Sequence, residues 1–562
     1  MRPAIATWLF ALSLAPSVAR ADFAAGMRAY EHGDFATALR EFTRAAEEGH
    51  VTAAVTLGSM YANARGVVQD YREAIKWYWM AAQKGSPDAQ FAVGQQYEKG
   101  WGTPADPQEA FRWYSRAAER QHPAAALALG NLYAAGKGVA QSEQEALRWY
   151  RVAAGRGLSP AQCELANLYA VGRGVAVNPA EAARWYRLAA EGGNSDAQHR
   201  LARMLAGGDG VPQNGEEAFR WERMAAESGN PDAQLGLAQM YADGKGTAQD
   251  DGLALKWRRQ LADQTGNTEA QFALAMHYAE GRGVPQDFRT ASRWLKVAAE
   301  KAHAEAFQQL IRLSGSIPPL EPGEALRIYT AAANKGNAQA QLLLGAMYAE
   351  GKGVPRNDEE AVNWYAQAAQ NGNAEAQYWM GVHFVHGRGV PKSVEQAMKW
   401  YEMAARQGMP EAQYALGYMY AGKEGIPANL AESYRWLRAS AEQGNADAAY
   451  GLALAYMEGK AVVPDLKEST RWMQEAAERG NALGQAALAG FYSRGQGVLQ
   501  DFLQAHIWAN LAAASGDIEA AKLRDEVARK MTAEQIAAAQ ERARAWTPRK
   551  GPVEGAPVRK NQ

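Results

Sequence analysis

The stretch that decides the fold runs from Asn373 to Gly408 and reads NAEAQYWMGVHFVHGRGVPKSVEQAMKWYEMAARQG. Apolar side chains in its second half recur at i, i+3, i+4, i+7 and i+8, namely Ala397, Trp400, Tyr401, Ala404 and Ala405. This spacing forms one apolar stripe with the period of an α-helix. The first half carries small and apolar residues at helical spacing, and Gly387 between the halves suits a left-handed helix end. We therefore predict two antiparallel helices joined by a tight glycine loop.

The tryptophan at position 400 recurs along most of the chain, at an interval of 36 residues almost everywhere. Its counterparts are Trp77, Trp113, Trp149, Trp185, Trp221, Trp257, Trp294, Trp364, Trp436, Trp472 and Trp508. One helix pair is hidden between Trp294 and Trp364, where Ile328 and Tyr329 fill the aromatic slots. A fixed interval of this length is typical of a helical solenoid, in which each pair buries its stripe against the next. We predict that these tryptophans are buried between stacked pairs.

The recurring pattern A-x-x-x-L-G-x-x-Y-x-x-G-x-G-V, followed by A-x-x-W-Y-x-x-A-A-x-x-G, resembles the Sel-1-like repeat, a relative of the tetratricopeptide repeat. The copy at residues 340–372 matches nearly every position, and the resemblance covers residues 22–546. It implies an all-α superhelical solenoid of about 13–14 stacked helix pairs, closed by a C-terminal capping segment. Members of this family are mostly adaptors and scaffolds in signalling or envelope assembly, and some secreted members bind host proteins.

Departures from the repeat interval mark the predicted boundaries. They separate a capping helix pair at 22–52, the solenoid at 53–516 with an irregular repeat at 303–336, capping helices at 517–546 and a disordered tail at 547–562. The irregular repeat includes a segment with three prolines, 314–323, which we interpret as a local irregularity in one stack. A hinge between two halves is the alternative. In the last capping helix, Thr532 and Gln535 have the spacing of a capping box.

The N-terminus has the pattern of a secretory signal peptide. Arg2 precedes an apolar run over residues 4–14, and small residues stand at Ala19 and Ala21. We expect removal of residues 1–21 by cleavage after Ala21, and a periplasmic or secreted mature chain without an integral membrane segment. An uncleaved membrane anchor is the alternative, although the apolar run is short for a span. The single cysteine, Cys163, excludes an internal disulfide and is expected to be a small buried residue.

The sequence contains none of the common catalytic signatures, such as G-x-S-x-G, H-E-x-x-H, C-x-x-C or G-x-x-x-x-G-K-[ST]. The G-x-G triplets follow predicted helices and recur from copy to copy, which indicates turns instead of phosphate loops. His383 and His386 share a helix face, but no third ligand stands near them, so we predict no metal site. A net charge of −1 gives no indication of nucleic-acid binding. We predict a monomeric, non-enzymatic protein without a cofactor.

The candidate binding residues lie at two slots of the leading helices, those of Trp379 and Val382, which vary most among the copies. The two slots share a helix face, and His386 extends it by one turn. Earlier copies are mainly polar there, whereas later copies form an apolar and aromatic strip. We predict that a protein or peptide binds this strip on the concave face, with Trp379 and Tyr418 as anchors. The predicted contact residues are Leu343, Ala346, Trp379, Val382, His386, Ala415, Tyr418 and Leu454. Burial of the strip against neighbouring helices is the alternative.

Together these features favour an exported scaffold that recruits another envelope protein in signalling or assembly. A secreted effector that binds a host protein is a second interpretation. A hydrolase acting on the cell wall or on β-lactams is a third and more remote one.

Overall fold

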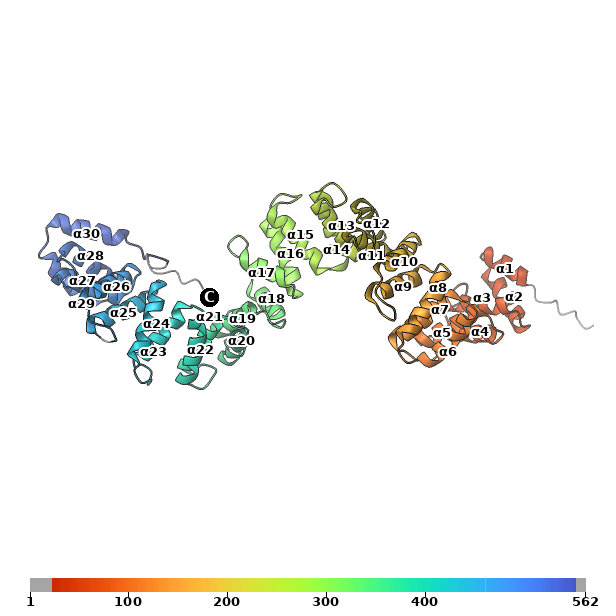
Figure 1. Ribbon diagram of the computed structural model, residues 1–562, viewed down its shortest axis with the longest axis horizontal. Coiled ribbons are helices and arrows are strands. Elements are labelled where there is room, and N and C mark those ends of the chain that lie inside the picture. The colour runs from red at the N-terminus through yellow and green to blue at the C-terminus, as the bar shows by residue number, and fades with distance from the viewer. Residues whose placement is uncertain (1–22, 460, 552–562) are drawn as a thin grey trace, which may run out of the picture. The chain divides into compact units, whose positions relative to one another are not determined.

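The computed structural model describes residues 23–459 and 461–551, and this part of the chain contains thirty helices and no strand (Figure 1). The predicted signal peptide at 1–21 lies outside the described residues. The helices are α1 (Phe23–Glu31), α2 (Phe35–Glu47), α3 (Val51–Ala62), α4 (Tyr71–Gln83), α5 (Pro87–Lys99), α6 (Pro107–Glu119), α7 (Pro123–Ala135), α8 (Glu143–Gly155), α9 (Ser159–Val171), α10 (Pro179–Glu191), α11 (Ser195–Gly207), α12 (Gly215–Glu227), α13 (Pro231–Asp243), α14 (Asp251–Thr265), α15 (Thr268–Glu280), α16 (Phe288–Glu300), α17 (Ala304–Arg312), α18 (Pro322–Ala333), α19 (Ala338–Glu350), α20 (Asp358–Gln370), α21 (Ala374–His386), α22 (Val394–Arg406), α23 (Pro410–Tyr420), α24 (Leu430–Glu442), α25 (Ala446–Glu458), α26 (Leu466–Glu478), α27 (Ala482–Arg494), α28 (Phe502–Ala514), α29 (Ile518–Ala528) and α30 (Ala533–Ala545).

Helices α1–α28 alternate as the leading and second helices of successive pairs, and α29 and α30 follow them. This arrangement confirms the predicted all-α solenoid. The chain divides into two compact units, residues 1–270 with 280–286 (unit 1) and residues 271–279 with 287–562 (unit 2). Within each unit, a second helix contacts both its own leading helix and the next one (Figure 1). Within the described residues, no helix combines the length and apolar character needed to cross a membrane.

A tyrosine that packs against a small residue of the leading helix forms the centre of many pairs. Tyr114 and Tyr401, each of which follows a periodic tryptophan, are buried. A Cβ placed on Gly381 would lie 2.5 Å from Cδ1 of Tyr401, and one on Gly94 would lie equally close to Tyr114. The ring therefore occupies the space that a side chain on the facing helix would need.

The periodic tryptophans are less buried than predicted. Trp113, Trp436, Trp472 and Trp508 are buried. The remaining eight are only half-buried: Trp77, Trp149, Trp185, Trp221, Trp257, Trp294, Trp364 and Trp400. The prediction is wrong for these eight because adjacent residues on a helix point about 100° apart. The buried residue that follows, a tyrosine in five of the eight copies, takes the direction between the two helices, and the tryptophan is left at the edge of the pair.

In eight of the pairs a buried glutamine links the pair to the preceding one, a contact that the repeat pattern did not reveal to us. Gln377 donates from Nε2 to the carbonyl oxygen of Ala369 at 3.1 Å, and Gln413 does the same to Ala405. Equivalent bonds are made by Gln90, Gln162, Gln198, Gln234, Gln341 and Gln485. Each bond adds a side-chain donor to a carbonyl in the last turn of the preceding second helix. The carbonyl oxygen of Ala369, for example, also accepts from the backbone nitrogen of Gly372 at 3.1 Å.

The G-x-G loop brings two glycines into left-handed conformations for different reasons. Gly387 ends α21 with a φ of 65°, which confirms the predicted left-handed helix end. Gly389, with a φ of 69°, lies against the start of α20 in the preceding pair. A Cβ there would be 2.8 Å from the backbone nitrogen of Glu359. The loop is therefore also a contact between pairs.

Two copies in unit 1 replace the central tyrosine with a charged residue. Glu222 is buried, and both of its carboxylate oxygens lie 3.0 Å from Nδ1 of His199. Burial raises the pKa of Glu222, and the hydrogen bond with His199 opposes this shift. Arg258, also buried, donates to Oε1 of Gln239 at 2.7 Å.

The irregular and terminal parts of unit 2 are also packed. Ile317, between α17 and α18, is buried in the same cluster as Phe307 and Ile328. Thr532 and Gln535 form the predicted capping box at the start of α30.

Residues 547–551, the first part of the predicted tail, lie against α26. Nη1 of Arg549 is 2.8 Å from a carboxylate oxygen of Glu478, and Glu475 is a second partner. The rest of the tail, 552–562, is outside the described residues.

Replacing Gly381 by alanine tests the tyrosine contact. We expect Gly381→Ala to destabilise the protein in urea, because overpacking costs about 1–3 kcal/mol and exceeds the gain in helix propensity of about 1 kcal/mol. Gly155→Ala is the matched control, since a Cβ there meets no atom within 4 Å. Equal effects of the two substitutions would contradict the packing account.

The buried carboxylate of Glu222 gives a pH-dependent prediction. A raised folded-state pKa means that Glu222 favours the folded state most below its usual pKa of 4.5, and that this contribution is lost as the pH rises through the folded-state pKa. Glu222→Gln should therefore raise the melting temperature near pH 7 and have little effect near pH 4. Glu216→Gln, on the exposed side of α12, should change neither. Destabilisation by Glu222→Gln at pH 7 would show that the His199 contact outweighs the burial of the charge.

Candidate functional site

The eight predicted contact residues lie on four leading helices of unit 2. They are Leu343 and Ala346 on α19, Trp379, Val382 and His386 on α21, Ala415 and Tyr418 on α23, and Leu454 on α25. Trp379 is 37% exposed and Tyr418 is 44% exposed, and His386 is also exposed. The other five are half-buried. Neighbouring helices therefore do not bury the strip, and its two largest rings remain accessible.

Trp379 is held in place by aromatic contacts on one side. Its ring stacks on Tyr365 of the preceding pair, with centroids 6.4 Å apart and an interplanar angle of 14°. It also meets Tyr378 edge-on at 5.5 Å. An exposed ring that is already fixed loses little conformational freedom when a partner covers it, which favours its use as a binding anchor.

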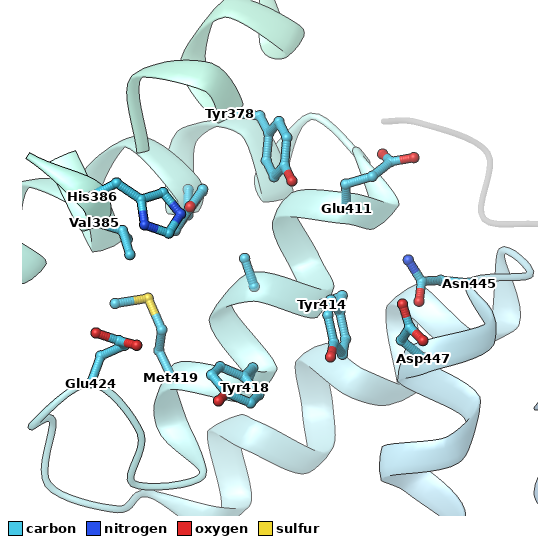
Figure 2. Close-up of a pocket in the computed structure, with 12 residues that line it drawn as sticks. Tyr378, Val385, His386, Glu411, Tyr414, Tyr418, Met419, Glu424, Asn445 and Asp447 are labelled. Atoms are coloured by element: carbon cyan, nitrogen blue, oxygen red, sulfur yellow. The ribbon is translucent and has the colours of Figure 1, made fainter. Parts of the chain in front are cut away.

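Beside Trp379, a groove of about 400 Å³ spans three successive pairs (Figure 2). It is lined by α21, α22, α23, the loop after α23 and the start of α25. Four tyrosines line it: Tyr378, Tyr401, Tyr414 and Tyr418. Three carboxylates line it as well: Glu411, Glu424 and Asp447. Its volume falls within the range of about 300–1,000 Å³ that is common for ligand-binding pockets.

The groove contains three of the eight predicted residues: His386, Ala415 and Tyr418. Val382 packs beside it in the cluster of Tyr401, whereas Leu343 and Leu454 belong to other clusters. The groove therefore takes in part of the predicted strip, and the other predicted residues lie outside its lining. The central part of the strip is the groove, with Trp379 at the side.

Sequence reasoning missed three of the four lining tyrosines, Tyr378, Tyr401 and Tyr414, and all three carboxylates of the lining. Tyr378 and Tyr414 hold the same slot in consecutive copies, and Glu411 and Asp447 share a slot in the first helical turn. A comparison of these slots would have indicated an acidic and aromatic surface. Glu424 lies in a loop that departs from the repeat, so no pattern pointed to it.

The carboxylates act electrostatically on the lining tyrosines. Burial raises the pKa of Tyr378, and Glu411 adds to this shift. Burial is also the main cause that raises the pKa of Tyr414, and the charge of Asp447 raises it further. Burial, Tyr378 and Glu424 together raise the pKa of Tyr401. The phenols of these three tyrosines therefore stay neutral, and the groove combines aromatic rings with negative charge.

His383 and Cys163 are both buried, as expected for residues with a structural role. His383 is buried with Nδ1 2.8 Å from the carbonyl oxygen of Arg388, so its ring ties α21 to the glycine loop. Cys163 is buried as predicted, and burial raises the pKa of its thiol to about 12. Among residues 23–459 and 461–551, no group of three or more His, Cys, Asp or Glu side chains could hold a metal ion.

Comparison with known proteins shows the same repeat along the chain. The Sel1 repeat model matches residues 52–86, 87–122, 123–158, 159–194, 195–230, 231–265, 268–303, 338–373, 374–409, 410–445, 446–481 and 482–517. The helix pair α17–α18 falls between the seventh and eighth matches. A comparison with curated proteins gave no match.

Solved structures of related proteins resemble the chain in sequence. One is c5321, a protective antigen present in uropathogenic Escherichia coli strains and displaying an SLR fold. It is 30% identical to this chain, with a TM-score of 0.46, and the match covers 84% of this chain and 94% of that chain. Another is a Sel1 repeat protein from Oxalobacter formigenes, with 31% identity and a TM-score of 0.40. The match covers 43% of this chain and 96% of that chain. On the twelve matched repeats and the identity to c5321, the chain belongs to the Sel1 repeat family.

Proposed function

We propose that this protein is a non-catalytic, exported scaffold that binds a protein partner through the leading helices of unit 2. Solenoids built from such repeats are typically protein-interaction scaffolds. The observation that supports this site is the exposure of Tyr418, which lines an open groove, and of Trp379, which contacts the lining residue Tyr378. Large exposed rings are unfavourable in water and are the preferred anchors of protein interfaces.

The equivalent face of unit 1 has a different character. Tyr150 and Tyr186 donate their hydroxyl hydrogens to Asn131 and Asn167 on the leading helices. The next leading helix, α11, exposes Arg200 in the slot of Trp379. An apolar partner surface would find few contacts there, so we assign binding to unit 2.

The composition of the groove favours binding over catalysis. Its twelve lining residues include no serine, cysteine or lysine, and the raised pKa values of Tyr378, Tyr401 and Tyr414 make these phenols poor nucleophiles at neutral pH. We therefore propose that the groove holds a partner without transforming it.

Export is supported by the N-terminal sequence pattern. The Escherichia coli relative is described as a protective antigen, a description that fits a protein that the immune system can reach. An envelope scaffold and a secreted effector remain two versions of this proposal, and the envelope scaffold is the one that we favour.

Removing the two anchors tests the binding site. We expect Trp379→Ser combined with Tyr418→Ser to abolish capture of the partner from an envelope extract, because loss of each anchor costs about 2 kcal/mol, or on the order of 1,000-fold together. Helix content and melting should not change, since both side chains are exposed. Met403→Ser on α22 is a matched control, because Met403 is 45% exposed on a second helix. Retained capture by the double variant would rule out this site.

Cell fractionation tests the location. We expect the mature protein in the periplasmic extract, with an N-terminal sequence that starts at Asp22. Recovery from the culture medium would favour the secreted effector. An intact N-terminus in the cytoplasmic fraction would contradict export.

A further inference from the structure

We propose that the groove selects a partner segment by a cationic side chain, with arginine preferred over lysine. This inference rests on the proposed function and specifies the chemistry of the partner. It is carried by the combination of aromatic rings and carboxylates in one groove.

The charged residues that line the groove are all acidic. Glu411, Glu424 and Asp447 contribute carboxylates, and neither lysine nor arginine is among the lining residues. Lys392 approaches Glu424 from outside, with 3.5 Å between its Nζ and Oε2 of Glu424. Asp447 accepts a hydrogen bond from Nδ2 of Asn481 at 2.7 Å, a neutral partner that leaves its charge in place. The groove therefore attracts a cation.

The tyrosines make this attraction specific. In Figure 2, Glu424 and Asp447 lie on opposite sides of the lining, with Tyr414 and Tyr418 between them. A ring face attracts a cation within about 6 Å of its centre, and a planar guanidinium can stack on the ring while its N–H groups reach a carboxylate. An ammonium group makes only the point-charge contact. This difference favours arginine.

The chain uses the same contact elsewhere with its own arginines. The guanidinium of Arg116 lies 4.5 Å from the ring centre of Trp113, and that of Arg435 lies 4.6 Å from Trp436. Arg151 lies over Tyr169 at 5.8 Å and donates to its hydroxyl. Within the described residues, no cation of this chain covers any of the four lining rings. A partner's arginine could make with the lining rings the kind of contact that these arginines make with Trp113, Trp436 and Tyr169.

The remaining lining suits the aliphatic part of such a side chain. Val385, Ala415 and Met419 add apolar surface next to the rings. Arginine buries its methylene stem along apolar surface while the charged end stays with polar groups. An arginine beside an apolar residue therefore matches both parts of the groove.

Two peptides of the same shape and different charge test this selection on the mature full-length chain. The probes are fluorescently labelled, N-acetylated pentapeptide amides, Gly-Leu-Arg-Leu-Gly and its analogue with neutral citrulline in place of arginine. We expect the arginine peptide to bind about tenfold tighter or more by fluorescence anisotropy, and a lysine peptide to fall between the two. Glu411→Gln combined with Asp447→Asn should bring the arginine-to-citrulline ratio close to one.

The control variant removes two carboxylates from comparable positions. Glu360 and Glu395 are exposed and lie in the first turns of α20 and α22, as Glu411 and Asp447 lie in the first turns of α23 and α25. Glu360→Gln combined with Glu395→Gln should keep the ratio of the parent. Circular dichroism on both variants checks that the helices are intact.

Three outcomes would overturn the inference. They are equal affinities of the two peptides, no binding of the arginine peptide at about 1 mM, and an unchanged ratio in the Glu411/Asp447 variant. If partner capture still depends on Trp379 and Tyr418, such a result removes the arginine preference and leaves the proposed function standing.

The chain's own C-terminal residues are the competing occupant, because residues 552–562 include Arg559 and Lys560. They follow Gly551, whose carbonyl oxygen lies against Gly444, next to Asn445 of the lining. A chain that ends at Gly551 should bind the arginine peptide as the parent does. Much tighter binding after this truncation would assign the groove to the tail instead of a partner.

Discussion

The close approach of a tyrosine ring to a small residue on the facing helix is the constraint on which the structure depends. Where Tyr401 lies against Gly381, the helices of the pair have no room for another side chain. The same tyrosine position also contacts the binding face, because the buried Tyr365 stacks against Trp379 of the next pair. The binding face is therefore built directly on the core contact.

The polarity of that face follows from what the leading helix offers to the tyrosine hydroxyl. In unit 1, Asn131 and Asn167 accept hydrogen bonds from Tyr150 and Tyr186, so amide side chains occupy the surface. In unit 2, the corresponding slots hold Ala346 and Val382, which have no acceptor. One slot thus decides whether a pair presents a polar or an apolar surface, while the helices keep the same packing. This separation lets a single fold carry two different faces.

The fold was predictable because its information is local and repeated. A helical period, a glycine at each loop and a fixed tryptophan interval were enough for the pairs and their number. Adjacent aromatic residues were harder, because period alone does not tell which of Trp400 and Tyr401 points between the helices. The groove was harder still. Glu411, Glu424 and Asp447 come from a helix, an irregular loop and the next pair, and their convergence depends on stacking geometry that no single repeat encodes.

Magnitudes explain why carboxylates alone would make a poor recognition site on this surface. An exposed ion pair contributes about 0–1 kcal/mol and is screened by salt, so three isolated acidic residues would discriminate weakly between partners. A cation over an aromatic ring gains about 0.5–1 kcal/mol when exposed and about 2 kcal/mol when water is excluded. Tyr414 and Tyr418 provide the surface that a bound segment would cover, and covering it lowers the local dielectric around the carboxylates. The rings and the charges therefore strengthen each other only when a partner fills the groove, which makes recognition depend on shape as well as on charge.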